Sequence, residues 1–489
     1  MSDVSLHEVT FLVIGAGFSG LGAAITLTRA GHRDLLVLER AADVGGTWRD
    51  NVYPGCRCDV PSNLYSYSFE AKPDWSETFP SQPELRDYLR GIVRTYHLGD
   101  YLRFGHEVTS ARWDGAYADG GRWLVEAGHV TFAARYLIGA AGALAEPSLP
   151  DIPGIGTFQG TIMHSARWDQ AWQATGRRVG VIGTGASAIQ IVPSIQPHAA
   201  HVTVFQRTAP FVMPHTNRPV RPWVQALYRA LPPAQRVARL SIYWGRELLC
   251  LGFTRYPWIL KRAEAVWRRH MESAVSDPVM RAQLTPAYDL GCKRILPSND
   301  FYPALAQPNV GLVTEKIIEI RPRTVVTADG AEHPVDTVIF ATGFHVTDNP
   351  MFGKITGAHG RTLAEAFGQT YLGTVVPGFP NYFQLTGANT GLGHSSMLLM
   401  IESQLSYLAD GIAKTRAAGG RFEVRAEVAA AYNAELQRKL PKTVWGSGCS
   451  SWYLDAEGRN LTLWPGFTFV FRRRTRTFRT DDFVFPASG

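Results

Sequence analysis

Apolar residues form a short run at two distant places in the chain, and each run leads into a glycine-rich turn and then a helix-like pattern. The first run is residues 11–14 (FLVI), before the turn 15–20 (GAGFSG). The second is residues 178–182 (RVGVI), before the turn 183–188 (GTGASA). A short apolar run bounded by glycine is typical of a buried parallel strand. The pattern therefore predicts two strand–turn–helix units.

The spacing of the glycines in both turns suits a dinucleotide. The first glycine permits a tight turn, the second lets a pyrophosphate approach the backbone, and the third lets the helix pack closely on the strand. The second turn has Ala188 in place of the third glycine. The candidate cofactor-binding residues are Gly15, Gly17, Ser19 and Gly20 in the first turn and Gly183, Thr184, Gly185 and Ser187 in the second. Two bound dinucleotides are expected.

The residue that ends the following strand differs between the two units. Glu39 and Arg207 each lie 24 positions after the first glycine of their turn (39 − 15 and 207 − 183). A carboxylate can accept hydrogen bonds from a ribose diol, whereas an arginine suits a ribose 2′-phosphate. We therefore expect FAD in the first unit and NADPH in the second. A surface glutamate and an exposed arginine at a strand end are the plain alternatives.

The rest of the chain alternates between helix and strand patterns. An amphipathic helix is expected around residues 82–96, and strands near 123–126, 136–142, 311–314, 324–327 and 336–343. Between 211 and 290 the periodicity is helical, with two apolar stripes that we expect to be core. The first stripe is Trp223, Leu227, Ala230 and Leu231, and the second is Val237, Leu240, Trp244, Leu248 and Leu251.

These patterns predict an α/β fold with two Rossmann-like dinucleotide-binding domains, one for FAD and one for NADPH, and a helical insertion in the NADPH domain. Three prolines between 147 and 153 mark a linker between the domains. The predicted segments are 1–145 and 346–489 for the FAD domain, 146–210 and 291–345 for the NADPH domain, and 211–290 for the insertion.

The composition of the chain limits the kinds of protein that it can be, but it does not indicate a function. A chain of 489 residues that is 45% hydrophobic can bury a large core in two or more domains. We expect no signal peptide and no membrane span, because the apolar stretch 240–260 is interrupted by Arg246, Glu247 and Arg255. Five scattered cysteines are too few for a disulfide framework, so we expect a reducing cytoplasm. We expect no metal site, because Cys56 and Cys58 lack a second ligand pair.

The chain is basic, with 49 Lys and Arg against 42 Asp and Glu, and five arginines fall between 472 and 479. Such a run can bind nucleic acid. No recognition motif accompanies it, and Phe471 and Phe478 bracket it as in a packed terminal strand. A solvated face is therefore favoured, and no nucleic-acid partner is expected.

The stretch between the two units carries a fixed pattern, F-x-G-x3-H-x3-W-D, formed by Phe158, Gly160, His164, Trp168 and Asp169. It resembles the fingerprint of the type I Baeyer–Villiger monooxygenases, and the resemblance covers most of the chain. Residues 45–59, with the pattern GGxW…YPGxxxD, resemble the flavin-contacting loop of flavin-dependent monooxygenases. The resemblance implies an enzyme that uses NADPH and O2 to insert oxygen next to a ketone carbonyl through a C4a-peroxyflavin, giving an ester or lactone.

The resemblance also assigns residues to roles. Arg294 corresponds to the catalytic arginine and Asp59 to the carboxylate that holds it, while Lys293 with Arg207 and Thr208 would grip the NADPH 2′-phosphate. Trp452 resembles the tryptophan that closes over the nicotinamide side. Thr47, Trp48, Tyr65, Val108 and Met397 fall at further cofactor-contact positions. His164 is expected to act as a hinge between the domains rather than as an acid or base, and His394 as a packed or capping residue.

Several alternatives stay open at this point. A flavin-containing N- or S-oxygenase of amines or sulfides would need the same cofactors without a carbonyl-activating arginine. A disulfide reductase is disfavoured because Cys56 and Cys58 do not form a CxxC pair. A non-catalytic redox sensor that binds FAD and NADPH is a third class. The expected partners are a small ketone or sulfide and O2, and the sequence does not decide between a monomer and a homodimer.

Overall fold

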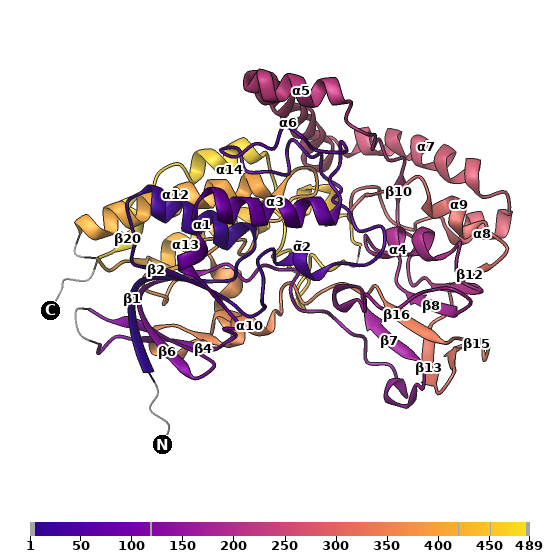
Figure 1. Cartoon of the computed structure of the whole chain (residues 1–489), viewed down its shortest axis with the longest axis horizontal. Helices are drawn as coiled ribbons and strands as arrows, with labels where there is room; N and C mark the ends of the chain where they lie inside the picture. Colours follow the sequence, from indigo (N-terminus) through magenta and orange to yellow (C-terminus); the bar gives the residue numbers. More distant parts are fainter. Residues whose placement is uncertain (1–4, 118–119, 419, 450, 486–489) are drawn as a thin grey trace.

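The computed structural model describes residues 5–117, 120–418, 420–449 and 451–485. Two β-sheets, the first mixed and the second parallel, lie side by side with helices packed against them, and the chain passes from the first to the second and back (Figure 1). Strands before residue 140 and after residue 350 belong mainly to the first sheet, and those between 161 and 340 to the second.

The first sheet contains the first predicted strand–turn–helix unit. Its parallel part runs in the order β3-β2-β1-β6, with β18 also paired to β6. The long strand β6 continues into an antiparallel meander with β5 and β4, and β17 adds to β4. The strands are β1 (Ser5–Ile14), β2 (Leu35–Glu39), β3 (Leu102–Phe104), β4 (Val108–Asp114), β5 (Arg122–Ala127), β6 (Val130–Gly139), β17 (Ile355–Thr356) and β18 (Tyr382–Gln384). The strands predicted near 123–126 and 136–142 are therefore confirmed.

Helices from both ends of the sequence pack against this sheet and against one another. The two central helices, α1 and α12, approach so closely that a Cβ atom at Gly22 would lie 2.6 Å from a methyl group of Leu405. The predicted amphipathic helix is α3, whose apolar side is buried. The helices are α1 (Phe18–Arg29), α2 (Thr47–Asp50), α3 (Gln82–Thr95), α10 (Pro350–Gly353), α11 (Leu363–Ala366), α12 (Met397–Ala417), α13 (Ala426–Lys439) and α14 (Thr468–Arg474).

The second sheet contains the second unit and is parallel throughout, in the order β12-β9-β8-β16-β7. A small antiparallel sheet, β13-β14-β15, lies beside it. The elements are β7 (Thr161–His164), β8 (Arg178–Ile182), α4 (Ala188–Ile195), β9 (His201–Phe205), α9 (Phe301–Leu305), β12 (Val310–Val313), β13 (Ile317–Arg321), β14 (Thr324–Thr327), β15 (Glu332–Pro334) and β16 (Thr337–Phe340). The α/β fold with parallel sheets is as predicted.

The two chain segments that connect the sheets run beside each other. Pro147 and Phe344 form an isolated antiparallel bridge, the amide of Ser148 donates to the Gly343 carbonyl at 2.9 Å, and that of His345 donates to the Glu146 carbonyl at 3.0 Å. The proline-rich linker is thus held against the segment that returns to the first sheet. The domain boundaries within these connections stay a prediction.

Residues 211–290 are helical, as expected, but their apolar stripes are not core. In the sequence, four helices come between the paired strands β10 (Val212–Met213) and β11 (Leu296–Pro297). They are α5 (Pro222–Ala230), α6 (Pro232–Thr254), α7 (Pro257–Ala274) and α8 (Pro278–Gln283). Trp223 is 61% exposed and Trp244 is 53% exposed, and most other large side chains of the stripes are exposed too. The core prediction is therefore wrong. Periodicity identifies an apolar face but not whether another element covers it.

The arginine-rich segment also differs from its prediction. It begins in a helix, α14, rather than a strand, although Phe471 and Phe478 are both fully buried as expected. Phe467 and Phe471 are four residues apart, which is a helical spacing. The short aromatic pattern in the sequence could not distinguish such a helix from a strand. A short strand pair, β19 (Glu423–Val424) and β20 (Phe483–Val484), closes the fold. Among the described residues, no helix is long and apolar enough to cross a bilayer.

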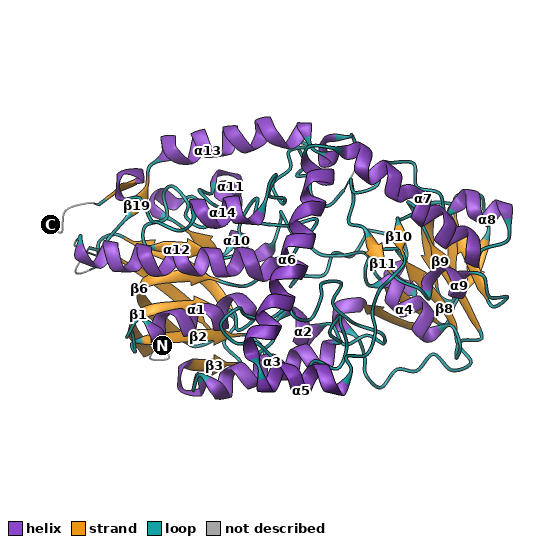
Figure 2. Ribbon diagram, turned by 90° about the horizontal axis from the view of Figure 1, so that it is seen from above, coloured by secondary structure: helices purple, strands orange, loops and turns teal. Residues whose placement is uncertain are grey.

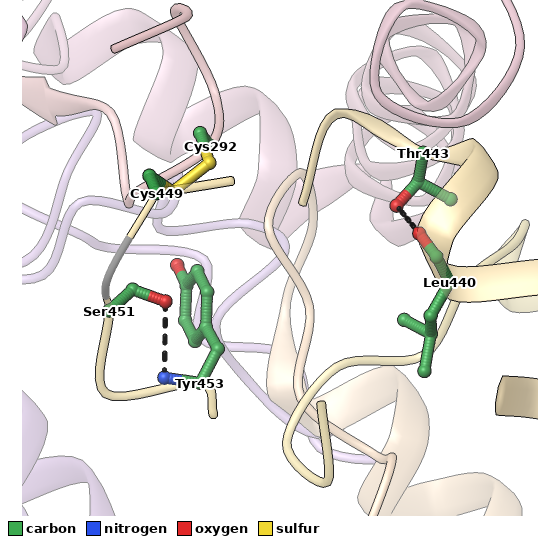
Figure 3. The surroundings of a disulfide bond; sticks show 6 residues. All are labelled: Cys292, Leu440, Thr443, Cys449, Ser451 and Tyr453. Carbon is green, nitrogen blue, oxygen red and sulfur yellow. Dashed lines mark hydrogen bonds between the residues drawn. A yellow bond between two sulfur atoms is a disulfide. The ribbon is translucent and has the colours of Figure 1, made fainter. Parts of the chain in front are cut away.

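One disulfide joins Cys292 to Cys449, whose Cα atoms lie 6.3 Å apart (Figure 3). The sequence predicted no disulfide framework, and the structure has this single bond, whereas Cys56, Cys58 and Cys250 are free and buried. The two bonded residues are 157 positions apart in the sequence, so spacing along the chain gave no sign of the pair. The bond ties the loop that precedes Lys293 to the loop that carries Trp452.

Candidate functional site

The first glycine turn has a backbone that only glycine accommodates at its start. Gly15 has a φ of +104°, and a Cβ atom there would lie 2.7 Å from the Ala140 carbonyl oxygen at the end of β6. Its amide donates to the Leu38 carbonyl at 2.8 Å. Residues with a side chain rarely adopt this φ. The short contacts show that the strand ends, the turn and the start of α1 form one tightly packed unit.

The second turn repeats this geometry. Gly183 has a φ of +110°, its amide donates to the Phe205 carbonyl at 3.0 Å, and a Cβ atom would lie 2.5 Å from the Ala341 carbonyl oxygen. A Cβ atom at Gly185 would meet no atom within 4 Å, so the middle glycine faces open space. The helix begins at Ala188, five residues after Gly183, whereas α1 begins three residues after Gly15. The methyl group of Ala188 therefore fits into a slightly longer turn.

Glu39 ends β2 beside the first turn and is almost completely buried. Its carboxylate accepts hydrogen bonds from the amides of Ala16 and Ala41, both at 3.0 Å, and pairs with Arg49 at 2.8 Å. The Glu39 carbonyl accepts a bond from the amide of His106, two residues before Val108 at the start of β4. Glu39 is therefore an organised buried acid rather than a surface glutamate.

Arg207 and Lys293 form a cationic cluster beside the second turn. Arg207 is exposed at the end of β9, and the neighbouring Thr208 is held to the turn because its carbonyl accepts a hydrogen bond from Thr184 Oγ1 at 3.1 Å. The ammonium of Lys293 lies 4.8 Å from the centre of the Tyr288 ring. Burial and the positive charge of Arg207 lower the pKa of Lys293. Neither cation has an ion-pair partner among the described residues, so the cluster can accept an anion.

Arg294, next in sequence, forms a bidentate ion pair with Asp59. Its Nε donates to Oδ2 of Asp59 at 2.7 Å and its Nη2 donates to Oδ1 at 2.6 Å, which is the geometry of a strong pair. Burial opposes ionisation of Asp59, but the charge and hydrogen bonds of Arg294 outweigh it and lower the pKa of the carboxyl group. The charge of Asp59 in turn raises the pKa of Arg294, which is therefore charged at any working pH.

One nitrogen of the guanidinium is left for another partner. Among the described residues, Nη1 of Arg294 has one contact, 3.5 Å from the Leu392 carbonyl oxygen, which is long for a hydrogen bond. About a third of the Arg294 side chain is exposed. The pair thus holds a fixed cationic group that is partly exposed to solvent.

The structure adds two residues to this site that the sequence did not single out. Arg246 on α6 lies close enough for the charges of Asp59 and Arg294 to act on it, while burial lowers its pKa. Tyr453 is buried beside the pair, and burial raises its pKa to about 12. The one signal for Arg246 was that it and its sequence neighbour Glu247 are charged residues inside an otherwise apolar stretch.

The predicted flavin loop reaches the same place from the first unit. Trp48, in α2, donates from Nε1 to the Tyr65 hydroxyl at 3.1 Å, and their rings pack edge to face. Thr47 begins the same short helix. The loop is tied to the second unit by Gln190 of α4, whose Nε2 donates to the Arg57 carbonyl at 3.1 Å. Asp59 therefore lies where the two units meet.

The motif at 158–169 forms the edge of the second sheet next to the first. Its strand β7 pairs with β16 through His164 and Phe340, and the following single-turn helix (Ser165–Arg167) contacts α2 of the flavin loop. Trp168 packs edge to face on Trp172, and Asp169 accepts a hydrogen bond from the Ala171 amide. A Cβ atom at Gly160 would clash with the Asp336 carbonyl and the Phe158 ring. The motif is thus a structural joint between the units.

His164 is buried within this joint. Its Nδ1 accepts a hydrogen bond from the Ala166 amide at 3.1 Å, and its ring packs on Phe344. Burial, with a smaller contribution from the charge of Arg167, lowers the pKa of His164 to about 4. The ring is neutral near pH 7, which makes it a poor proton donor.

The C-terminal candidates are Trp452, Met397 and His394. Trp452 is 47% exposed, and its ring centre is 4.4 Å from that of Tyr453. Met397 begins α12, which packs on α1. His394 is buried, with its Nε2 3.6 Å from the Glu247 carboxylate, which agrees with a packed residue. A separate cleft of about 310 Å³ between α1, α12, α6 and α14 contains none of the candidate cofactor residues.

Two dinucleotide-binding units that meet at a fixed arginine–aspartate pair define a flavin- and nicotinamide-dependent oxidoreductase. Residues 12–238 match the family described as pyridine nucleotide-disulphide oxidoreductase. A Baeyer–Villiger monooxygenase of Streptomyces coelicolor is 50% identical over 479 residues, covering 96% of this chain and 92% of the relative. The chain belongs to the Baeyer–Villiger monooxygenases, as the sequence motif predicted.

Solved structures agree with this assignment. A closed crystal structure of cyclohexanone monooxygenase is 28% identical, with a TM-score of 0.89, covering 99% of this chain and all of that one. A complex of the protein named OTEMO with FAD and NADP is 27% identical, with a TM-score of 0.84, covering 96% of this chain and 97% of that one. FAD and NADPH are the cofactors, as predicted, and the protein is a flavin-dependent monooxygenase.

Proposed function

We propose that this monooxygenase inserts one atom of O2 next to the carbonyl of a small ketone, giving an ester or lactone, and that Arg294 is its catalytic residue. The observation that carries the proposal is the bidentate Arg294–Asp59 pair at the meeting point of the two nucleotide units. An oxygenase of amines or sulfides does not need a fixed cation for a carbonyl oxygen. The partners proposed are therefore a ketone and O2.

The two turns fit their cofactors. At the first turn the tight glycine backbone and the buried Glu39 suit the pyrophosphate and ribose of FAD. At the second, the open space before Gly185 and the Arg207–Lys293 cluster suit NADPH with its 2′-phosphate. The further contacts proposed for the cofactors are Ser19, Thr47, Trp48, Tyr65, Val108, Thr184, Ser187, Thr208, Met397 and Trp452. When bound, FAD supplies the oxygen-activating chemistry with electrons from NADPH.

Arg294 would act through position and charge. Its guanidinium keeps its proton at any working pH and can stabilise negative charge that develops on oxygen during the reaction. Asp59 occupies Nε and Nη2 and thereby leaves Nη1, with its long contact to the Leu392 carbonyl, for another partner. Asp59 is therefore proposed as a positioning residue, and Arg246 as a second source of positive field at the same site.

The motif at 158–169 is proposed to couple the two units rather than to take part in proton transfer. A neutral, buried His164 packed on Phe344 suits a hinge. The single-turn helix that follows His164 contacts α2, so a movement of the hinge would be transmitted to the flavin loop. A His164→Ala variant is expected to consume NADPH with less product formed per cofactor. Unchanged coupling in that variant would contradict the hinge.

The proposal is tested by replacing Arg294 with alanine. We expect NADPH still to reduce the flavin, while product formation from a panel of cyclic, linear and aryl ketones falls by about 100- to 1000-fold, because one preorganised charge at a developing oxyanion contributes about 3–4 kcal/mol. Flavin absorbance in anaerobic mixing measures the first step, and product mass spectrometry measures the second.

A matched control is Arg321→Ala, which removes an arginine that pairs with Glu319 and Glu332 on the small antiparallel sheet. This control should keep full activity. Ketone oxidation at the wild-type rate in Arg294→Ala would refute the proposal. Sulfides belong in the same panel, since loss of ketone oxidation with retention of sulfide oxidation would assign Arg294 to the carbonyl specifically.

We also propose a cytoplasmic location, which is supported by three free, buried cysteines. Under this proposal the Cys292–Cys449 pair is reduced in the cell and oxidises after isolation in air. Alkylation of thiols at the moment of lysis, followed by mass spectrometry, measures the state of the pair. A fully oxidised pair in freshly lysed cells would contradict the location.

A further inference from the structure

The outward side of helix α6 is apolar along most of its length. Five large side chains on it are 45–66% exposed, at Val237, Leu240, Trp244, Leu248 and Leu249. The first four are spaced three or four residues apart and so form one stripe. The opposite side of the helix is buried in the protein at Glu247, Cys250 and Phe253. A surface helix ordinarily presents polar residues to water, so this stripe is unusual.

The neighbouring helices extend the stripe into a surface. Helices α5, α6 and α7 lie together on one side of the molecule, along the top of Figure 1, and α6 crosses the centre of that side in Figure 2. Of the 22 large apolar side chains exposed among the described residues, twelve lie between 223 and 266. We call this surface the α5–α7 face. Besides those of α6, its apolar members are Trp223, Leu227, Leu231, Tyr256, Trp258, Ile259 and Val266.

Phe469 of α14 adds to the same surface from outside the three helices. It is 41% exposed, and its ring centre is 6.1 Å from that of Trp244. The apolar surface is therefore continuous between elements more than 200 positions apart in the sequence rather than confined to one helix. A continuous exposed apolar surface of this kind marks a docking site.

The α5–α7 face also carries the positive charge of the protein. Residues 221–270 contain ten Lys and Arg against two Asp and Glu, while the whole chain has 49 against 42, so the remainder has 39 against 40. One of the two acids, Glu247, is buried and accepts hydrogen bonds from Thr468. The exposed cations are Arg221, Arg229, Arg236, Arg255, Lys261, Arg262, Arg268 and Arg269.

Aromatic and basic side chains are interleaved on this face. The Arg262 guanidinium lies 4.9 Å from the centre of the Trp258 ring, and that of Arg255 lies 6.0 Å from the Tyr256 ring. Tryptophan and tyrosine favour the boundary between hydrocarbon and headgroups, and lysine and arginine favour anionic headgroups. A lipid surface with negative charge matches both features at once.

Two other occupants match only one of them. A second copy of this chain, joined face to face, would bring the same positive surface against itself. A nucleic acid would neutralise the cations but leave the apolar stripe in water. We propose that the α5–α7 face docks the protein on the surface of a membrane that contains anionic phospholipid, with α6 lying along that surface.

Docking through this face would place the membrane against the helix that also lines the candidate site. Trp244 and Leu248 point outward from α6, whereas Arg246 between them lies near Asp59 and Arg294. The membrane-facing and site-facing sides of α6 are thus separated only by the width of one helix. The docking itself does not depend on the proposed reaction and is measured without substrate.

The test is co-sedimentation of the full-length holoprotein with vesicles of phosphatidylcholine, with and without phosphatidylglycerol. We expect a partition coefficient at least about tenfold higher on the anionic vesicles, falling as salt is added, because several basic residues contribute together. A Trp244→Gln/Leu248→Gln variant should lose binding by about tenfold or more, because the apolar stripe no longer inserts.

Matched controls separate the apolar and ionic contributions. Leu149→Gln/Ile318→Gln alters two apolar residues outside the face that are 53% and 44% exposed, and this variant should bind as the wild type does. Arg262→Glu/Arg269→Glu should lose the preference for phosphatidylglycerol. Flavin content and the unfolding temperature of each variant establish that it is folded.

Three outcomes would overturn the proposal. The first is a wild-type protein that stays in solution with both kinds of vesicle. The second is a Trp244→Gln/Leu248→Gln variant that still binds fully, which would reduce the contact to unspecific ionic attraction. The third is a concentration-dependent dimer, abolished by the same variant, which would make the face an interface between two copies.

Discussion

The two nucleotide turns share one backbone design and differ in what lies at the ribose end. In both, the first glycine has a φ above +100° and lies against the carbonyl that follows a parallel strand, Ala140 in one unit and Ala341 in the other. In the first unit the strand ends in Glu39, which is buried and hydrogen bonded. In the second, Arg207 lies two residues after the end of β9 and is exposed near Lys293.

We infer from this difference which part of each unit sets the cofactor. The turn provides a place for a pyrophosphate in both cases, because its shape depends on glycines and on strand ends alone. We propose that the charge beyond the second strand then selects between a free ribose hydroxyl and a 2′-phosphate. Substitutions in the turns should therefore abolish binding of the dinucleotide. Substitutions at the ribose end should change the preference between dinucleotides.

The largest effect is expected from adding a methyl group to the first glycine of either turn. Gly183→Ala should raise the KM for NADPH by about 100-fold or more while FAD stays bound, because strain and a clash with the Ala341 carbonyl together cost about 3 kcal/mol. Gly15→Ala should instead yield protein without flavin. Flavin absorbance of the purified variants and steady-state kinetics measure the two effects.

Gly330→Ala is a matched control for these variants. Gly330 also has a positive φ, +82°, but a Cβ atom there would meet no atom within 4 Å. This variant carries the backbone strain without the clash and should bind both cofactors. Loss of FAD in Gly183→Ala would contradict the prediction that each turn binds its own cofactor without affecting the other.

Arg207 should set the preference for NADPH over NADH. Arg207→Ala is expected to raise the KM for NADPH by about 10- to 100-fold, since a hydrogen bond to a charged group contributes about 1.5–3 kcal/mol, with little change for NADH. Arg178→Ala, on the same sheet but paired with Asp336 at 3.1 Å, is the control. An equal loss with both nucleotides would place Arg207 away from the 2′-phosphate.

A smaller effect should appear in the pH dependence of the same preference. Because burial and the charge of Arg207 lower the pKa of Lys293, its ammonium loses a proton at a lower pH than an exposed lysine does. As pH rises through that pKa, kcat/KM for NADPH should fall while that for NADH does not. In Arg207→Ala the pKa of Lys293 should rise and the fall should move to higher pH. A Lys293→Arg variant whose profile matched that of the wild type would contradict this origin.

The smallest effect on binding is expected from the disulfide. Cys449→Ser releases Cys292, the neighbour of Lys293, and should raise the KM for NADPH only a few-fold while lowering stability by about 2–4 kcal/mol. Thermal unfolding and kinetics of the oxidised protein measure both. A dithiol reductant should reproduce the effect on the wild type and leave Cys449→Ser unchanged. A larger change in kcat than in KM would place the disulfide in the reaction itself.

Much of this architecture was predictable because the information is local. Each turn, its strand and its helix lie within about 30 residues, and the register of Glu39 and Arg207 follows from counting along the chain. The family motif at 158–169 identified the class of enzyme and, by resemblance, the pair Asp59 and Arg294, which are 235 positions apart. Neither periodicity nor spacing could have paired these two residues.

The sequence by itself determined the two nucleotide units, their order and their charges, because those features depend on glycines and apolar runs that act over short distances. Tertiary structure alone decided that Cys292 bonds Cys449, that Arg246 lies within electrostatic reach of Asp59 and Arg294, and that the stripes of α5 and α6 face outward. The role of an apolar face, a cysteine or an arginine depends on the residues that pack against it. When those residues are far apart in the chain, the local sequence around each one does not indicate the contact.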